Sequence, residues 1–478
     1  MIKAIRNFLQ RFKAASGAIS GTFRLIGGQL IPYKTDKITY IERGYAYNDI
    51  LYCVINRIVE KAIVPSWAPY RIIDEKAYFQ ARAMLKDMAT HGATNNGDFA
   101  KAIRMNQKAI VKLDDEALNN LIRYPNENDT WSDLQRAHFT YKLTTGDYFE
   151  AGWSSGSSGG LTPGTPRTLY TIAPQFMSIL ASDTLPLVAK GYLLQMGTEI
   201  PFTAEDILHE RYFNPEWDIY GHQLYGMSPI KAYLRRLQRN NTGQTRNTKY
   251  AENGGADDIV YLDDPRLVGE DGFRLAIEQT SKMKKSFYEE QSGVNNAGKA
   301  VWSPFKLGNI KLTFSPKELM LLDQEKFDLT MAALLYNAPP VLFSTEASTY
   351  NNMENGERAL VVNCAIPLNL SREASLNRKL QQIPRYKGKN IIISPDLSCY
   401  TELQANRKEQ VEWLSKSLLP VYRWYEIQGE DRPEGMTDEM WNSIIVPTGT
   451  QLFSDLFVNA NDLSNEMSRL QDQNLNDY

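Results

Sequence analysis

The sequence has few cysteines, few histidines and no long apolar run. Its three cysteines are far apart and form no CxxC pair, which fits a reducing compartment and excludes a disulfide framework. The four histidines form no HExxH or HxH pair, so we expect no metal and no cofactor. The longest apolar stretch, residues 359–370, is interrupted by Asn363 and Pro367 and is shorter than the roughly 18 residues of a membrane span. We therefore expect no stable membrane insertion.

Length and net charge limit the classes of protein that remain. A chain of 478 residues is too long for one core and indicates two to four domains. The 42% apolar and 23% charged residues are typical of a folded soluble protein. Because the net charge is -3, any contact with nucleic acid must be local.

The N-terminal 35 residues form a basic arm. Residues 1–33 carry five cations and no acidic residue, and their apolar residues fall at helical spacing. The cations interrupt any signal-peptide core. The arm could lie on a membrane surface, contact a partner or nucleic acid, or pack on its own or a neighbouring subunit.

A long cationic segment follows Ser228. Ser228-Pro229 is typical of a helix start and Asn253-Gly254 of a helix stop, which predicts a helix over residues 227–254. Residues 240–249 show no apolar stripe, so this helix spans water, faces other copies or lines something charged. Its cations are Lys231, Arg235, Arg236, Arg239, Arg246 and Lys249.

The remaining pattern mixes helices with short strands. Apolar periodicity and turn residues predict their positions, and Pro367 should kink the last long helix. The segment 91–115 is polar and indicates an insertion or an excursion. Helices are expected at 47–63, 74–90, 133–145, 270–291, 315–337, 353–382 and 402–418, and strands at 148–153, 167–172, 259–262 and 391–393.

Three patterns imitate catalytic sites. The loop Gly293–Lys299 nearly matches a phosphate-binding Walker loop, but it follows a helix, precedes a strand and has Ala300 where a hydroxyl should bind Mg²⁺. Residues 156–160 match a nucleophile elbow inside a low-complexity loop. His209 is best interpreted as a structural histidine. No nucleophile, base and orienting group converge, so we expect no enzyme.

An ordered series of short motifs resembles the portal proteins of tailed bacteriophages. Each motif is weak alone, but their joint order over roughly residues 40–440 is fairly specific. The series includes Tyr52–Ile58, Tyr124-Pro125-Asn126 with Trp131, Thr145–Phe149, Phe213-Asn214-Pro215, Tyr225-Gly226-Met227-Ser228-Pro229, Asn253-Gly254-Gly255, Ala297-Gly298-Lys299, Ser315-Pro316, Asn337-Ala338-Pro339-Pro340, Ser348–Asn352, and Pro367 with Leu376–Leu380.

The resemblance implies an α+β, portal-like subunit with a wing, a helical stem, a clip and a crown. Such subunits assemble into a ring, usually of twelve. Carried onto this sequence, the parts are the basic arm (1–35), wing (36–226), first stem helix (227–254), clip (255–313), second stem helix (314–338), channel loop (339–352), kinked helix (353–383), crown or wing return (384–458) and polar tail (459–478).

The resemblance also implies sites and partners. A channel loop would offer hydroxyls and amides, which contact phosphates weakly, with one acidic residue: Ser344, Thr345, Glu346, Ser348, Thr349, Asn351 and Asn352. The implied partners are other copies in the ring, double-stranded DNA bound without sequence preference, the large terminase subunit as motor, the major capsid or scaffold protein, and a head-tail adaptor. The implied place is the virion's portal vertex, with the host cytoplasm during assembly.

We expect the stem cations to pair between subunits and to tune the channel. Charge reversal at Arg239 or Arg246 should then disturb assembly or packaging before it disturbs folding of the monomer. Two alternatives stay open: a nucleic-acid-processing NTPase that uses Gly293–Lys299, and a membrane-surface scaffold that uses the basic arm.

Overall fold

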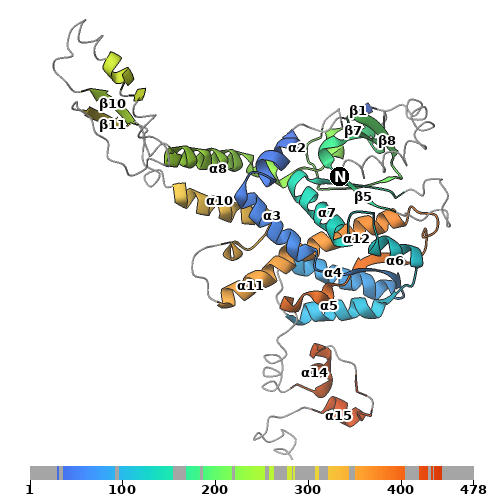
Figure 1. Cartoon of the computed structure of the whole chain (residues 1–478). Helices are drawn as coiled ribbons and strands as arrows, with labels where there is room; N and C mark the ends of the chain where they lie inside the picture. The colour runs from blue at the N-terminus through green and yellow to red at the C-terminus, as the bar shows by residue number, and fades with distance from the viewer. Residues whose placement is uncertain are drawn as a thin grey trace, which may run out of the picture. The chain divides into compact units, whose positions relative to one another are not determined.

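In the computed structural model the chain forms two compact units that interleave along the sequence (Figure 1). The first unit takes residues 1–63, 116–360 and 374–387, and the second takes 64–115, 361–373 and 388–478. Helices and strands occur in both, so the expected α+β class is confirmed. The structure describes residues 29–31, 36–91, 96–153, 168–182, 187–217, 221–252, 258–262, 277–282, 284–285, 307–311, 321–343, 350–403, 419–428, 432–433 and 435–443.

Capping residues mark the start of α3 (Asp49–Ala62) and both ends of α7 (Trp131–Thr145) among the helices of the first unit. The other helices include α2 (Asp36–Thr39), the π-helix η1 (Tyr40–Tyr45) and α6 (Glu116–Arg123). The side chain of Asn48 accepts a 3.0 Å bond from the Leu51 amide and so caps α3. Thr130 and Asp133 form a capping box at the start of α7. Gly146 ends α7 in the left-handed region, with φ of 82°.

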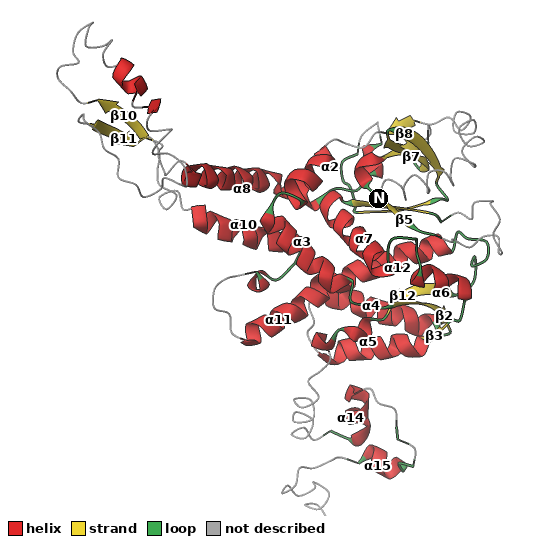
Figure 2. Ribbon diagram, viewed as in Figure 1, coloured by secondary structure: helices red, strands yellow, loops and turns green. Residues whose placement is uncertain are grey.

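Two antiparallel sheets contribute to the core of the first unit (Figure 2). Their strands are β1 (Gln29–Ile31), β4 (Asp147–Ala151), β5 (Tyr170–Ile172), β6 (Met177–Ala181), β7 (Ala189–Met196), β8 (Thr198–Thr203) and β9 (Ile207–Arg211). One sheet has the order β5-β4-β9 and the other β1-β6-β7-β8. Apolar residues of both sheets, among them Phe149, Ile179 and Phe202, form one buried cluster. The end of the expected basic arm thus belongs to a sheet, because β1 pairs with β6.

The expected cationic helix is α8 (Pro229–Glu252), which lies beside α10 (Leu321–Leu335) in the first unit (Figure 1). Asn337, with φ of 57°, follows α10 before the proline pair. Between the two helices, β10 (Asp258–Leu262) pairs antiparallel with β11 (Leu307–Lys311). Residues 277–282 and 284–285 are also helical. The rest of the expected clip, including the loop 293–299, lies outside the described residues.

The kinked helix has the interruption that Pro367 predicts. It consists of α11 (Tyr350–Leu360), a π-helical segment η8 (Val361–Ala365) and α12 (Ile366–Leu380). Proline lacks an amide hydrogen and its ring crowds the carbonyl four residues earlier, so the turns before it cannot keep regular α-helical bonding. The wider π turns directly precede Pro367.

The second unit shows that residues 91–115 are no excursion. They contribute α5 (Asn96–Ala109), which packs on α4 (Glu75–His91), and the strand β3 (Ile110–Lys112). Phe99, Ala102 and Ile103 are buried. The sequence prediction was wrong here because the Asn/Gly cluster at the start of α5 hides a helix whose few apolar residues still fall at helical spacing. The sheet has the order β12-β2-β3, with β2 (Trp67–Ile72) and β12 (Ile391–Pro395).

Shorter elements complete the described chain. They are the 3-10 helices η2 (Pro174–Phe176), η3 (His222–Leu224), η7 (Pro340–Leu342), η9 (Leu397–Cys399) and η10 (Thr401–Leu403), with α14 (Val421–Gln428) and α15 (Asp438–Asn442). The helix expected at 402–418 lies outside the described residues from 404 onward, as does the polar tail. In the described part of the chain, no helix combines the length and apolarity of a membrane span.

Candidate functional site

The start of α8 is fixed by a serine that bonds in two directions. The hydroxyl of Ser228 accepts a 3.1 Å bond from the Ile230 amide, which confirms the predicted cap. The same hydroxyl donates to the carbonyl of Thr144 at the end of α7. Ser228 is buried, so the cap also ties α8 to α7.

Two glycines bring the backbones of these segments into contact. A Cβ placed on Gly226 would lie 2.0 Å from the Gly146 carbonyl oxygen, and a Cβ on Gly146 would lie 2.5 Å from the Met227 carbonyl oxygen. No other residue fits such an approach. The segment Tyr225–Pro229 is therefore shaped by its contact with the turn that ends α7.

A buried carboxylate organises the same place. Asp147 is fully buried and accepts bonds from the Gly226 amide (2.7 Å) and the His209 Nε2 (2.9 Å), and it forms an ion pair with Lys37. Lys37 Nζ also donates to the Gly226 carbonyl at 2.7 Å. Burial by itself would raise the pKa of Asp147, but Lys37 and His209 outweigh it and hold the pKa below its ordinary value. His209 is thus a structural partner of Asp147, as the sequence predicts.

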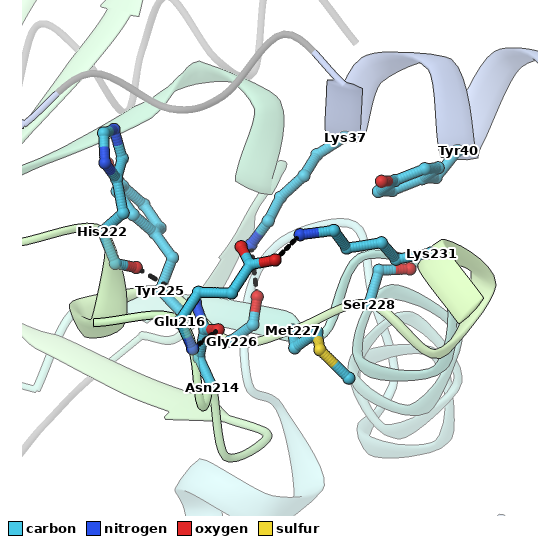
Figure 3. A pocket seen from close by; sticks show the side chains of 10 residues that line it. All are labelled: Lys37, Tyr40, Asn214, Glu216, His222, Tyr225, Gly226, Met227, Ser228 and Lys231. Atoms are coloured by element: carbon cyan, nitrogen blue, oxygen red, sulfur yellow. Dashed lines mark hydrogen bonds and ion pairs between the residues drawn. The ribbon is translucent and has the colours of Figure 1, made fainter. Parts of the chain in front are cut away.

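A small polar pocket lies over this junction (Figure 3). Its walls include Lys37, Tyr40, Asn214 and Lys231, and Figure 3 shows the Lys231 ammonium paired with Glu216. The side-chain amide of Asn214 donates to the carbonyls of Tyr225 (3.1 Å) and His222 (3.2 Å). Polar groups that line the pocket form hydrogen bonds and an ion pair with one another. We therefore interpret the pocket as a structural contact that holds residues 213–216 against the start of α8.

One face of α8 is buried along the first half of the helix. Ile230, Tyr233 and Leu237 are buried, and Asn240 continues the same face as a buried amide. The Asn48 amide donates to the side-chain oxygens of Asn240 (2.8 Å) and Asn241 (2.7 Å). The polar second half of α8 is therefore held to the start of α3 by amide bonds, which periodicity of apolar residues could not predict.

The cations of α8 gather on the other side. At 100° per residue, five of them fall within an arc of roughly 80°: Lys231, Arg235, Arg239, Arg246 and Lys249. We call these five the cationic stripe. Arg236 lies outside it. The stripe is exposed along α8, from Lys231 to Lys249.

Asp328 of α10 changes the expected role of two cations. It is buried and pairs with Arg239, and its carboxylate lies 3.5 Å from the Arg236 guanidinium. The Tyr233 hydroxyl donates to the Asp328 main-chain carbonyl at 2.9 Å. Arg239 thus has an ion-pair partner within its own chain, and its expected pairing with a neighbouring subunit stays a prediction.

The structure describes only part of the expected channel loop. Ser344, Thr345, Glu346, Ser348 and Thr349 lie outside the described residues. Asn351 and Asn352 lie in the first turn of α11 rather than in a loop, and Asn352 is exposed. Residues 340–342 form η7.

Sequence reasoning missed Asp147 and Asp328. A single acidic residue in a helix or strand gives no signal of burial, because its partners come from distant segments. Among the described residues, no group of three or more His, Cys, Asp or Glu side chains could hold a metal ion.

Comparison with known proteins gives the family of a chain with this buried turn, long helix pair and small antiparallel sheets. Residues 100–418 match the family model described as phage portal protein. The match covers more than half of the chain. The chain belongs to the phage portal protein family, as the motif series predicts.

Relatives in sequence are distant. An uncharacterized protein of Rickettsia bellii (strain RML369-C) is 23% identical over 257 residues, which is 52% of this chain and 62% of the relative. One of Rickettsia felis (strain ATCC VR-1525 / URRWXCal2) is 24% identical over 209 residues, 42% of this chain and 51% of the relative. The matches span between half and two thirds of these curated relatives.

Solved structures share the fold. A chain from the neck of a native gene transfer agent particle, computed with C12 symmetry, has a TM-score of 0.54 and 19% identity, over 85% of this chain and 97% of that chain. A chain from the virion of the native gene transfer agent particle has a TM-score of 0.54 and 18% identity, with the same coverage. At this identity the likeness establishes the fold.

Proposed function

We propose that this protein is the portal subunit that forms the DNA channel at one vertex of a capsid. In this role it serves genome packaging, head-tail connection and genome ejection. Membership of the phage portal family supports the proposal, together with a fold shared with neck proteins of a phage-like particle. That neck structure was computed with C12 symmetry, which supports a ring, and we propose twelve subunits.

The observation that carries the proposal is the construction of α8. One face is bonded to α3 through Asn240 and to α10 through Tyr233. A different face carries five cations, of which Arg239 also pairs with Asp328 of α10. A helix of 24 residues that spans about 36 Å with one anchored and one charged face suits the wall of a polyelectrolyte channel. We place the α8–α10 pair in that wall.

Weak attraction is what a conduit for DNA needs. Each lysine or arginine that neutralises a phosphate adds a salt-dependent attraction. Two members of the stripe are already paired inside the chain, Lys231 with Glu216 and Arg239 with Asp328. The net charge of -3 also disfavours retention of DNA. We infer that DNA is guided without being held, with the channel loop 339–352 adding hydroxyl and amide contacts.

The proposed partners follow from the same role. They are double-stranded DNA without sequence preference, a terminase large subunit that supplies the packaging energy, the major capsid or scaffold protein, and a head-tail adaptor. The proposed place is the virion's portal vertex, with the host cytoplasm during assembly. The protein itself is proposed to be structural and not an enzyme.

Images of the purified full-length protein in negative stain, with its mass in solution, test the proposal. We expect closed rings with a central hole and a mass near twelve subunits. A protein that stays monomeric at all concentrations would contradict it.

A further inference from the structure

A histidine, a carboxylate and a lysine meet on each face of the strand pair β4–β9. They are His209, Asp147 and Lys37 on one face, and His138, Glu210 and Lys142 on the other. The two groups use neighbouring strand positions, and neighbouring residues of a strand point to opposite faces. His138 and Lys142 belong to α7, so their group holds that helix against the sheet.

The group around Asp147 holds the segment that leads into α8. Asp147 accepts a bond from the Gly226 amide, and Lys37 donates to the Gly226 carbonyl (Figure 3). Arg211 of β9 donates to the carbonyl of Gln223. Three bonds to this segment therefore come from one set of charged side chains. We call Lys37, Asp147, His209 and Arg211 the junction cluster.

The His209 ring is enclosed in the first unit. Its side chain is 8% exposed. The ring stacks on Phe149 with the centroids 4.2 Å apart, and the Tyr192 ring lies edge-on at 5.8 Å. Its Nε2 lies 2.9 Å from a carboxylate oxygen of Asp147, which only accepts, so the neutral ring carries its hydrogen on Nε2. A further proton goes to Nδ1 and makes the ring a cation.

A proton on His209 would unbalance the junction cluster. With a neutral ring, the one carboxylate of Asp147 already faces the ammonium of Lys37. Burial lowers the pKa of His209, and Asp147 opposes this effect. Arg211 and Lys37 lower the pKa further. Of these groups, histidine is the one that ordinarily titrates between pH 5 and 8. The closed cluster therefore disfavours the proton, and an opened cluster accepts it.

The segment before α8 is the part of this contact that can move. Asp147, His209 and Arg211 lie on strands that pair over five residues of backbone. Residues 222–226 instead form the short 3-10 helix η3 and the two residues after it. A contact that only held the segment would not need a histidine, because glutamine, asparagine or threonine can donate to a carboxylate without a change of charge.

We propose that the junction cluster is an acid-sensitive switch. A proton taken up by His209 loosens the bonds to residues 223–226, so the start of α8 separates from the sheet before the first unit unfolds. The switch is a property of the single subunit and does not depend on the proposed ring.

Hydrogen–deuterium exchange of the full-length protein tests the switch. Exchange is followed at residues 222–233 and corrected for the intrinsic effect of pH. If the opened form takes up the proton with the ordinary histidine pKa of about 6.5, stability of the closed form is full above that pH. It falls below that pH, and a step from pH 7.5 to 5.5 favours opening by up to about tenfold.

We expect exchange at residues 222–233 to rise about fivefold to tenfold over this step, and exchange in α5 of the second unit to rise less than about twofold. A rise below about twofold at residues 222–233, or an equal rise in α5, would overturn the inference.

His209→Gln tests whether this histidine is the cause, because glutamine can still donate to Asp147. Its exchange at residues 222–233 should change less than about twofold between the two pH values. His222→Gln is the matched control, since His222 lies in the same segment but outside the junction cluster. It should keep the wild-type response. A full response in His209→Gln, or its loss in His222→Gln, would overturn the inference.

If His209→Gln fails to fold, Lys37→Gln gives the second test. Without the ammonium of Lys37, the Asp147 carboxylate can hold the protonated ring of His209 as an ion pair. Acid should then no longer raise exchange at residues 222–233, and a response equal to that of the wild type would overturn the inference.

Discussion

Gly226 lies so close to Gly146 that a Cβ on Gly226 would stand 2.0 Å from the Gly146 carbonyl oxygen. This contact joins the turn after α7 to the residues that start α8. The Gly226 amide and carbonyl are both bonded as well, to Asp147 and Lys37. The direction in which α8 leaves the first unit is therefore set by backbone contact and by one buried carboxylate.

Gly226→Ala should be among the most damaging small substitutions in the chain. The methyl group would collide with main-chain atoms that cannot move aside, so we expect a loss of about 3 kcal/mol or more in the free energy of unfolding, or no folded protein. Urea unfolding measures it. Gly197→Ala is the control, since Gly197 has φ of 71° but no atom of the described residues outside its chain neighbours lies within 4 Å of a Cβ placed on it. It should lose only about 1–2 kcal/mol.

Charge reversal at Arg239 should destabilise the monomer itself. Arg239→Glu would put a second carboxylate against buried Asp328, and we expect a cost of about 2 kcal/mol, because Arg239 is half exposed and can turn to water. Arg235→Glu reverses an exposed charge on the same stripe and should change monomer stability by less than about 0.5 kcal/mol. Equal effects of the two variants on the free energy of unfolding would contradict the ion pair between Arg239 and Asp328.

Asn48 should carry two separable roles. It caps α3 and its amide bonds Asn240 and Asn241 of α8. Asn48→Ser keeps a cap but loses the amide bonds, whereas Asn48→Ala loses both. We expect Asn48→Ala to cost about 1 kcal/mol more than Asn48→Ser in urea unfolding. If the two variants were equal, the cap would contribute nothing.

Acid should weaken the first unit through His209. Burial lowers the pKa of His209 below 6.5, although Asp147 opposes this. The unfolded chain then binds a proton more readily than the folded chain, so stability is full above pH 6.5 and falls as pH drops from there toward the folded pKa. His209→Gln, which can still donate to Asp147, should flatten the dependence of the urea midpoint between pH 7 and 5. An unchanged slope would exclude His209 as the cause.

Local signals predicted much of the fold. Ser228-Pro229 and Pro367 each impose a conformation on their neighbours whatever surrounds them: Ser228 caps α8 as predicted, and the regular helix is interrupted just before Pro367. The partners of Asp147 and Asp328 could not be predicted, because they come from segments far away in the sequence. The error over 91–115 has a related cause. A few apolar residues on α5 are enough to hold this helix in the core, because α4 and a sheet pack against them. The polarity of the local sequence gives no sign of these packing partners.

A cryo-electron microscopy reconstruction of the assembled protein tests the central claim most directly, because it locates α8 and α10 relative to the ring axis. The account predicts a closed ring in which the α8–α10 pairs form the wall around the central hole, with α3 on the side away from it. A ring with α8 and α10 on its outer rim, or an assembly without a central hole, would contradict it.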